Sequence, residues 1–347
     1  MRCACALLVV LVGSSALAQD IRIGVFSLFH PSELTVGPGS GNAVVARADQ
    51  QSLILDSGSL SHRIMIRAEN SVIEIRSGSQ LLLTHEVTFT SRTGGPVEFV
   101  LSVPGKIARR YRGRLCVSNV SSELVPVVTM DLETAVASVV AAETIGKEPP
   151  AALQAQAVAT RSYFLAGKGR HRDFDFCDTT HCQFLRSPPA PKAPAFEATA
   201  ATRGLVLKFR SQAFAAMYTR SCSGRTRTPA DVGLAPGNYP YYPVECLYCR
   251  RHPNRWHTRI SSPDAAKLRP SDEPSRLKAT RTLGWDSIPS NDFTMRQEGA
   301  QALLDGVGQG HGIGLCQSGA RAMAEHGANF REILAHYYPN TEVVAQP

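Results

Sequence analysis

Residues 131–166 read DLETAVASVVAAETIGKEPPAALQAQAVATRSYFLA, and the organisation of the chain follows from this stretch. Thr129 or Asp131 can cap a first helix, in which apolar residues recur at helical spacing at Leu132, Val136, Val139 and Val140. The Pro-Pro pair ends this helix and begins the next, because proline is tolerated in the first turn of a helix. We therefore expect two consecutive helices, the second over about residues 151–164.

The chain before these helices has the pattern of short strands. Short apolar segments begin at residues 21, 52, 63, 71, 80 and 97, and Gly, Ser, Asn or Pro separate them. After residue 125 the pattern becomes helical. We therefore expect an α+β protein, with a β-rich N-terminal lobe over residues 19–125 and a catalytic core of mixed helices and strands over residues 126–347, arranged around a cleft.

The expected core contains several further elements. A Pro-rich connection at 187–194 precedes a short helix and two strands, GLVLKF and AFAAMY. Residues 250–300 are polar and Pro-rich, which indicates a surface insertion with one or two helices. The tail begins with GHGIGLCQ, a Gly-rich loop, and continues as two helices that are separated at Gly327, with Asn329 as the cap of the second.

The first 18 residues have the three parts of a secretory signal peptide: one Arg, an apolar run and small residues before the cleavage position. No later run approaches the roughly 20 apolar residues that a membrane-spanning helix needs. We therefore expect a secreted or periplasmic protein with no membrane span. Of the nine cysteines, the seven that remain after cleavage are Cys116, Cys177, Cys182, Cys222, Cys246, Cys249 and Cys316. This odd number means that one thiol stays free in an oxidising compartment or that some of the sulfurs bind metal.

The chain is basic, with a formal net charge of +8. Arginine and histidine side chains gather at residues 109–114 and 250–257. Basic clusters are typical of nucleic-acid binding, but an exported protein meets anionic envelope polymers instead, and most such clusters are solvated surface. We therefore expect no nucleic-acid partner.

Glu143 is the strongest candidate for chemistry. At about 100 degrees per residue, helical geometry places it on the same stripe as Leu132, Val136 and Val139. A carboxyl on an apolar stripe is desolvated, which raises its pKa and keeps a proton available for general-acid work. The alternative is a structural carboxyl that caps a helix or pairs with an arginine such as Arg161.

His171, Cys177, His181 and Cys182 place four nitrogen or sulfur ligands within one short segment. Zinc prefers thiolate and imidazole ligands, so the segment predicts a metal site. A disulfide between its two cysteines is the alternative. Cys246 and Cys249 form a second close pair, for which a disulfide and a share in a metal site both stay open.

His311 lies between two glycines in GHGIGLCQ. Glycines let the backbone approach a ligand closely, and the loop displays the imidazole, which favours a place in a cleft. Cys222 and Cys316 also neighbour glycines. A cysteine enzyme that uses one of them as nucleophile and His311 as base is therefore a further alternative.

Four ordered blocks across residues 126–341 resemble the stage II sporulation protein D family, also called the amidase-enhancer family: DLETAVASVVAAE, ALQAQAVATRSYFLA, CDTTHCQ, and GHGIGLCQSGARAMAEHG with REILAHYYP. The resemblance implies a lytic transglycosylase that cleaves stem-peptide-free peptidoglycan glycan, with one Glu as acid and base. The matching position here is Glu143. The resemblance also implies a zinc ion held by Cys177 and Cys182, with His171 and His181 nearby.

We further expect a set of side chains to bind substrate: Arg161, His181, Gln183, Tyr218, Ser223, His311 and Gln317. All but Arg161 follow from the resemblance. The chain also departs from the family pattern. Cys316 stands where Met or Ser is more usual, and the pair of Cys246 and Cys249 looks like an addition of a subgroup.

The expected function is therefore cleavage of peptidoglycan glycan strands to 1,6-anhydro-muramyl products through Glu143. This reaction needs no second carboxylate. A hydrolase would need two carboxyls, and Asp175 or Asp178 would be the candidates for the second. A different alternative is a non-catalytic glycan-binding protein of the cell wall that stimulates a partner amidase.

Overall fold

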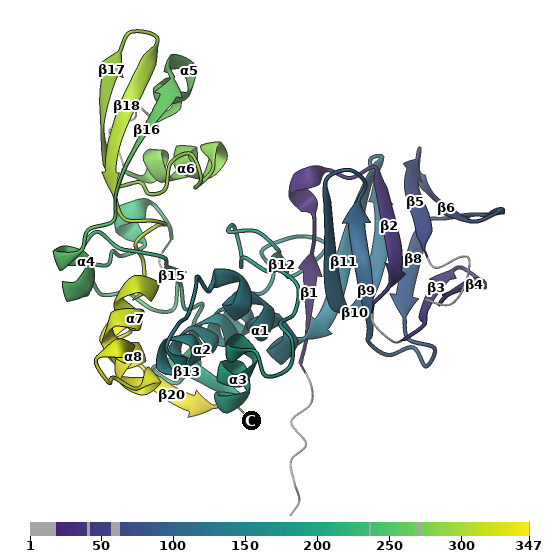
Figure 1. Ribbon diagram of the computed structural model, residues 1–347, viewed down its shortest axis with the longest axis horizontal. Coiled ribbons are helices and arrows are strands. Elements are labelled where there is room, and N and C mark those ends of the chain that lie inside the picture. The colour runs from purple at the N-terminus through teal and green to yellow at the C-terminus, as the bar shows by residue number, and fades with distance from the viewer. Residues whose placement is uncertain (1–18, 40–41, 57–62, 236, 269–272, 347) are drawn as a thin grey trace, which may run out of the picture.

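The computed structural model describes residues 19–39, 42–56, 63–235, 237–268 and 273–346. A β-rich lobe, a helical centre and an arm that rises from this centre make up the molecule (Figure 1). The expected signal peptide, residues 1–18, lies outside the described residues. Among the described helices, none combines the length and the apolar character needed to cross a membrane.

One mostly antiparallel sheet forms the N-terminal lobe and curls into a half-barrel. Its strands are β1 (Asp20–Gly24), β2 (Glu33–Pro38), β3 (Val44–Ala48), β4 (Gln51–Leu55), β5 (Ile64–Glu69), β6 (Val72–Ser77), β7 (Gln80–Thr84), β8 (Glu86–Thr90), β9 (Val97–Val103), β10 (Ile107–Val120), β11 (Glu123–Asp131) and β12 (Phe176–Cys177). The hydrogen-bonded order is β12-β1-β11-β10-β9-β2-β5-β6-β7, while β3, β4 and β8 pair alongside it. Strand β11 thus runs beyond residue 125 and reaches the first helix.

Alternating burial explains the strands of this lobe. Every second side chain of β9 is buried, namely Val97, Phe99, Leu101 and Val103. This period is typical of a sheet with one face on a core and the other toward solvent. In the core, the ring of Tyr111 contacts those of Phe26 and Phe99.

The first helix begins where β11 ends. The carboxylate of Asp131 accepts a hydrogen bond from the backbone N–H of Thr134 at 3.0 Å. Asp131, one of the two caps expected from the sequence, is therefore the N-cap of α1 (Leu132–Glu143). Helix α2 (Pro150–Ala166) starts at the second proline of the pair, and both expected helices are confirmed. The core of the lobe continues into them through Val136 and Phe164. The end of α1 is therefore held in a fixed position relative to the sheet.

The centre contains several further elements. They are α3 (Pro194–Ala201), β13 (Leu205–Phe209), β14 (Gln212–Ala213), β15 (Tyr218–Thr219), η2 (Ala230–Val232), α4 (Leu247–Arg251), β19 (Leu315–Cys316), α7 (Gln317–Glu325), α8 (Phe330–Tyr337) and β20 (Glu342–Ala345). Strand β15 pairs in parallel with β19, which places two distant segments side by side. Asn329 caps α8, as expected, through a capping box with Glu332. The strand expected over AFAAMY forms only at its two ends.

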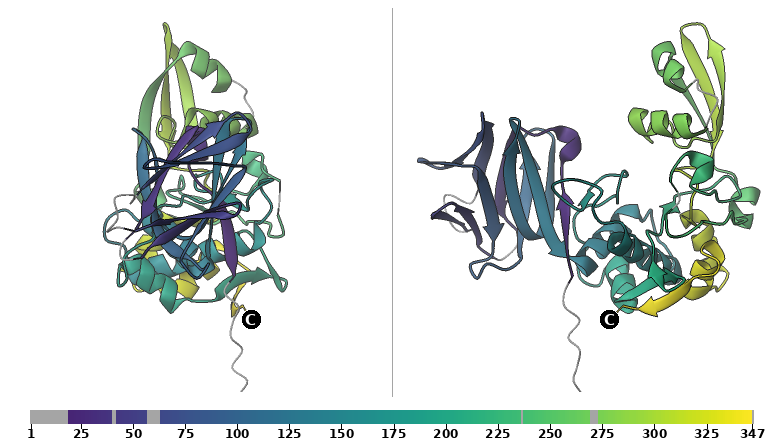
Figure 2. Two further views of the ribbon diagram at one scale, coloured as in Figure 1. Left: turned by 90° about the vertical axis from the view of Figure 1, so that its right-hand side faces the viewer. Right: turned by 180° about the vertical axis from the view of Figure 1, so that it is seen from behind.

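The arm contains β16 (Arg255–Ser261), α5 (Ser262–Leu268), α6 (Glu273–Leu283), β17 (Phe293–Glu298) and β18 (Gln301–Val307). The two helices agree with the expected insertion, but its three-stranded sheet was not expected. These strands bury only a small core of their own, around Leu268, Phe293 and Leu304. Their polar outer faces explain why the apolar signal is weak. Figure 2 shows the arm and the β-rich lobe on either side of the helical centre. The expected α+β class is confirmed.

Arg161 links the helices of the centre. Its side chain is fully buried, and its guanidinium pairs with the Glu133 carboxylate at 2.7 Å. It also donates to the backbone carbonyls of Leu205 and Thr199 at 2.9 Å and 3.3 Å. One side chain on α2 thereby joins α1, the end of α3 and β13.

Replacing Glu133 by Ala would leave this buried guanidinium without its counter-charge. We expect Glu133→Ala to lower the free energy of unfolding by about 3–5 kcal/mol, the usual cost of removing one partner of a buried ion pair. Urea unfolding followed by circular dichroism measures the change. Glu33→Ala, which breaks the more exposed pair with Arg67, is the control and should cost less than about 1 kcal/mol. Equal effects of the two substitutions would contradict the role assigned to Arg161.

Candidate active site

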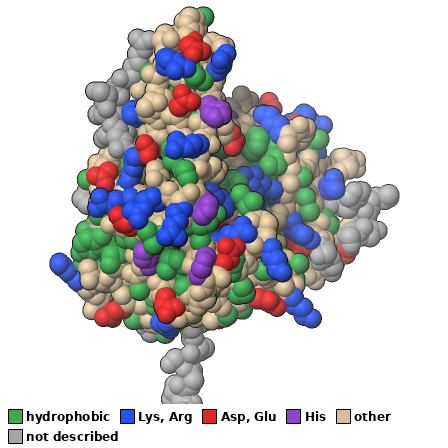
Figure 3. Space-filling model, turned by 60° about the vertical axis from the view of Figure 1, so that its left-hand side comes forward, with side chains coloured by type: hydrophobic (Ala, Val, Ile, Leu, Met, Phe, Trp, Pro, Cys, Tyr) green, Lys and Arg blue, Asp and Glu red, His purple; other side chains and the backbone are tan. Residues whose placement is uncertain are grey.

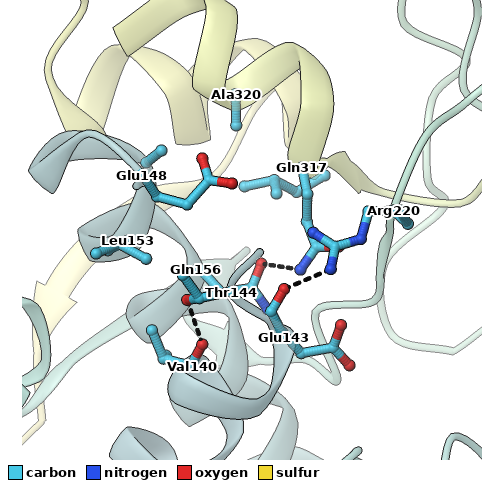
Figure 4. Close-up of a pocket in the computed structure, with 11 residues that line it drawn as sticks. Val140, Glu143, Thr144, Glu148, Leu153, Gln156, Arg220, Gln317 and Ala320 are labelled. Atoms are coloured by element: carbon cyan, nitrogen blue, oxygen red, sulfur yellow. Dashed lines mark hydrogen bonds between the residues drawn. The ribbon is translucent and has the colours of Figure 1, made fainter. Parts of the chain in front are cut away.

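A pocket lies where the end of α1, the start of α2 and the start of α7 meet (Figure 4). It encloses about 320 Å³, part of which is open to solvent. Its polar lining comes from Glu143, Thr144, Glu148, Gln156, Arg220 and Gln317, and apolar side chains form the rest. Two carboxyls, two amides and one guanidinium thus meet at one partly apolar space.

Glu143 is the last residue of α1 and is partly exposed at this pocket. Burial of its carboxyl among protein atoms raises its pKa, whereas the charge of Arg220 and a hydrogen bond with Gln317 act in the opposite direction. The partial negative charge at the C-terminal end of a helix also disfavours a carboxylate. The raised pKa expected from the sequence is therefore found. The pairing with Arg161 that the sequence left open is not formed, because Arg161 pairs with Glu133.

Arg220 ties the two walls of the pocket together. Its guanidinium donates to the backbone carbonyl of Glu143 at 2.7 Å, as drawn in Figure 4. Its own backbone carbonyl accepts the hydroxyl of Ser318, on α7, at 2.9 Å. This arginine was missed in the sequence, where it stands in a turn-rich stretch far from either helix.

Glu148 is a second carboxyl that the sequence analysis missed. Desolvation raises its pKa, and its carboxylate lies 3.8 Å from the Arg321 guanidinium. Figure 4 shows that the carboxyls of Glu143 and Glu148 point in different directions. The only signal in the sequence is a Glu directly before the Pro-Pro pair, and only the fold brings it to the end of α1.

The two aspartates considered for a hydrolase have structural partners instead. Asp178 is buried and pairs with Arg109 at 2.7 Å. Asp175 accepts the backbone N–H of Arg22 at 3.0 Å. Both carboxylates hold the segment around β12 against the sheet, and neither lines the pocket of Glu143.

Two glutamines near Glu143 each have one side-chain polar atom without a partner in the described part of the chain. Gln183 is 2% exposed, and its side-chain carbonyl accepts the hydroxyl of Tyr218, whose pKa the Glu143 charge helps to raise. The Gln183 Nε2 and the Gln317 Oε1 are buried without a hydrogen-bond partner among the described residues. Buried polar atoms without partners are costly. A ligand that both accepts and donates hydrogen bonds, as sugar hydroxyls do, would satisfy them.

His311 lies in the Gly-rich loop before β19. Its Nδ1 accepts the backbone N–H of Ile313 at 3.1 Å, which leaves the proton on Nε2. Desolvation, with the charge of Arg281, lowers its pKa to about 4, so the imidazole is neutral at pH 7. His311 and Ser223 line a second, smaller hollow of about 210 Å³, and not the pocket of Glu143.

The expected substrate-binding residues are thus distributed over several places. Gln317 lines the pocket, while Gln183 and Tyr218 form a hydrogen-bonded pair close to Glu143. Arg161 lies in the interior, where Glu133 and backbone carbonyls engage its guanidinium. The structure therefore corrects the expected role of Arg161 from sugar binding to a structural one.

The side chains of His171, Cys177, His181 and Cys182 (the His/Cys cluster) converge as expected. Their ligand atoms all lie within 4.8 Å of one another. Nε2 of His171 is 3.2 Å from the Cys182 Sγ, and Nδ1 of His181 is 3.5 Å from the same sulfur. The adjacent residues His181 and Cys182 thus both face one point. This donor set fits a metal ion such as zinc.

The sulfurs of Cys222, Cys246, Cys249 and Cys316 (the four-cysteine cluster) also lie within 4.8 Å of one another. No disulfide joins any of the seven described cysteines, and Cys116 lies outside both clusters. Cys222 and Cys316 are buried and face other cysteines. Cys222 also lines the second hollow together with His311, but its side chain is only 1% exposed there, which disfavours a role as nucleophile.

In both basic clusters some side chains pair with acidic residues. Arg109 pairs with Asp178 and Arg114 pairs with Asp20 at 2.6 Å, while Arg250 pairs with Glu245 at 3.0 Å. Residues 250–252 and 255 are exposed. Figure 3 shows Lys, Arg and His side chains gathered across the middle of one face of the molecule.

Comparison with known proteins identifies the segment that carries the pocket. Residues 120–209 match the family model described as Stage II sporulation protein. This segment of the chain is thus of the SpoIID family. The SpoIID match contains Glu143, Glu148 and the whole His/Cys cluster, whereas the four-cysteine cluster lies beyond it.

Several relatives support the SpoIID assignment. Stage II sporulation protein D of Bacillus subtilis (strain 168) is 24% identical over 271 residues, which cover 65% of this chain and 76% of the relative. An uncharacterized protein of Brachyspira hyodysenteriae is 26% identical over 268 residues, 67% of this chain and 72% of the relative. The amidase enhancer of Bacillus subtilis is 36% identical over 63 residues, 18% of this chain and 9% of the relative.

The lowered pKa of His311 predicts a pH-dependent stability. The unfolded chain takes up a proton on this imidazole near pH 6.5, whereas the folded chain does so only near pH 4. The contribution of the neutral His311 imidazole to the free energy of unfolding is thus fully present above pH 6.5. This contribution is lost as the pH falls toward 4. NMR titration, with the resonance assigned by comparison with His311→Gln, should give a pKa of about 4. Titration of the His311 imidazole near pH 6.5 would show that it is solvated.

Proposed function

We propose that this SpoIID protein is a peptidoglycan lytic transglycosylase that acts outside the cytoplasmic membrane, on glycan strands that lack stem peptides. The observation that carries the proposal is Glu143, which lines the pocket and whose carboxyl has a raised pKa. The family membership and the relative named amidase enhancer support a role at the cell wall.

In the first step, Glu143 acts as the acid. Its proton moves to the glycosidic oxygen, the bond from that oxygen to the muramyl anomeric carbon breaks, and the leaving sugar departs with a free hydroxyl. A carboxyl whose pKa is raised by desolvation retains the required proton nearer to neutral pH. Activity should therefore fall as the pH rises above the pKa of Glu143.

In the second step, the same group acts as the base. The Glu143 carboxylate takes the proton of the muramyl 6-hydroxyl, whose oxygen bonds to the anomeric carbon and closes the 1,6-anhydro ring. Glu143 is then protonated again. No water is consumed and no second carboxylate is needed. Arg220, whose charge acts on Glu143, stabilises the carboxylate that exists between the two steps.

The glutamines orient the sugar in this proposal. The free Nε2 of Gln183 can donate to a sugar hydroxyl, and the free Oε1 of Gln317 can accept from one. His311 and Ser223 line the second hollow and would contact a more distant part of the glycan chain. Exposed arginines at residues 250–255 would attract the anionic wall polymer.

Product analysis separates this reaction from hydrolysis through two carboxyls. We expect the mature protein to release 1,6-anhydro-muramyl ends from stem-free glycan, as measured by mass spectrometry. Glu143→Gln should abolish the product, whereas Glu148→Gln, the matched control in the same pocket, should retain it. A different result would contradict this mechanism: the wild-type protein forms reducing muramyl ends, and both Glu143→Gln and Glu148→Gln lose this product. That result would indicate a hydrolase in which Glu148 acts as the second carboxyl.

A second candidate function is a non-catalytic wall protein that stimulates a partner amidase. The similarity to an amidase enhancer over 63 residues favours it. In that case the wild-type protein and Glu143→Gln would bind stem-free glycan equally well, and neither would cleave it. Increased turnover by an added cell-wall amidase would then identify the partner activity.

We also propose that the ion of the His/Cys cluster is zinc. The two cysteines and two histidines would supply four ligands to the ion, the number typical of a structural rather than a catalytic zinc site. Cys182 directly precedes Gln183, so an ion bound there would fix the loop that presents this amide.

Removal of the two cysteine ligands tests this site. Cys177→Ser with Cys182→Ser should lose one zinc per chain relative to the wild type, as measured by mass spectrometry of the metal content. Cleavage should also weaken, because Gln183 loses its fixed position. Cys116→Ser, which changes a cysteine outside both clusters, should retain the wild-type zinc content. Unchanged zinc in the double variant would exclude the site.

A further inference from the structure

The four-cysteine cluster lies apart from the segment that matches the SpoIID family. Cys222 follows β15, Cys246 precedes α4, Cys249 lies within α4 and Cys316 ends β19. Their exposed fractions are only 0–3%. Four buried thiols from three separate parts of the chain thus face one point between α4 and the start of α7.

We propose that these four cysteines hold one zinc ion in a second, purely structural site. A tetrahedral zinc with bonds of about 2.3 Å to four sulfurs separates those sulfurs by about 3.8 Å. The Sγ atoms of Cys249 and Cys316 lie 3.5 Å apart, and all four lie within 4.8 Å. A disulfide requires about 2.05 Å between sulfurs. The spacing therefore fits a shared ion better than two disulfides.

The groups around the sulfurs fit thiolate ligands. The backbone N–H of Cys222 points to the Cys316 Sγ at 3.4 Å, and the hydroxyl of Tyr337 points to the Cys246 Sγ at 3.5 Å. The hydroxyl of Ser221 is 3.5 Å from the Cys249 Sγ. Hydrogen-bond donors of this kind orient the ligands of a metal and offset their negative charge. On zinc binding the four thiols release their protons to solvent.

Gly319 has no side chain, and this leaves the space that the Cys246 sulfur occupies beside α7. A side-chain carbon at this position of α7 would lie 2.6 Å from the Cys246 Sγ and would also collide with the Tyr337 hydroxyl. Such a short contact forces one of these groups to move. A glycine is therefore required where the sulfur approaches the helix.

This second zinc would hold the base of the arm and one wall of the pocket. Cys316 is followed by Gln317, and Cys222 lies two residues after Arg220. The arm extends from the chain between Cys249 and Cys316. One ion would thus connect the two ends of the arm to the two segments that present Gln317 and Arg220 to the pocket.

The metal content of the full mature chain tests the proposal independently of any activity. The variant Cys177→Ser with Cys182→Ser leaves the four-cysteine cluster unchanged and should still hold one zinc per chain. Adding Cys249→Ala should remove this zinc, and adding Cys116→Ser instead should not. Failure of the proposed glycan cleavage would leave these expected values unchanged.

Two further measurements keep the test decisive if the alanine variant does not fold. Cobalt exchanged into the variant that lacks the first site should show the intense sulfur-to-metal absorption of a tetrahedral thiolate centre, and Cys249→His should weaken that absorption but retain the ion. The wild-type chain, denatured without reductant, should have the mass of the fully reduced protein once metal is removed. No bound metal, iron in place of zinc, or a mass lower by the four hydrogens of two disulfides would overturn the proposal.

Discussion

The proposed chemistry depends on the environment that disfavours a charged Glu143. The carboxyl stands at the C-terminal end of α1, where the helix carries partial negative charge, and protein atoms remove much of its water. This position is fixed from the other end of the helix, because Asp131 caps α1 at the last residue of β11. Arg220 limits the effect, since its guanidinium lies close enough to stabilise the carboxylate form. Gln317 and the charge of Arg186 act in the same direction as Arg220, and desolvation outweighs all three, so the pKa stays raised. The two proposed chemical steps rely on this balance.

The two cysteine-containing clusters have one feature in common. In each, a cysteine directly precedes a glutamine that has a buried polar atom without a hydrogen-bond partner in the described part of the chain: Cys182 with Gln183, and Cys316 with Gln317. The first pair belongs to the segment shared with the SpoIID family, and the second lies beyond it. The arrangement also accounts for the odd number of cysteines, because six belong to two clusters and Cys116 stays apart.

The sequence predicts those parts of the molecule in which local pattern and tertiary environment agree. Helical spacing, a capping Asp131 and a Pro-Pro pair define α1 and α2, and short apolar segments define much of the half-barrel. Strands β16–β18 were missed because their outer faces are polar and their core is small. Arg161 was assigned to substrate because no local signal shows that Glu133 neutralises it. Glu148 and the four-cysteine cluster depend on contacts between distant segments, which spacing alone does not reveal.

The proton affinity of Glu143 tests the central claim most directly. Carbon-13 NMR of the side-chain carboxyls, recorded as a function of pH and compared with Glu143→Gln, isolates this one group in the folded protein. Desolvation predicts a pKa clearly above the ordinary value of about 4.3 for glutamate. A pKa at or below that value would mean that the carboxyl is well solvated or firmly paired with Arg220. Glu143 would then hold no proton to donate near neutral pH, and the single-acid mechanism would fail.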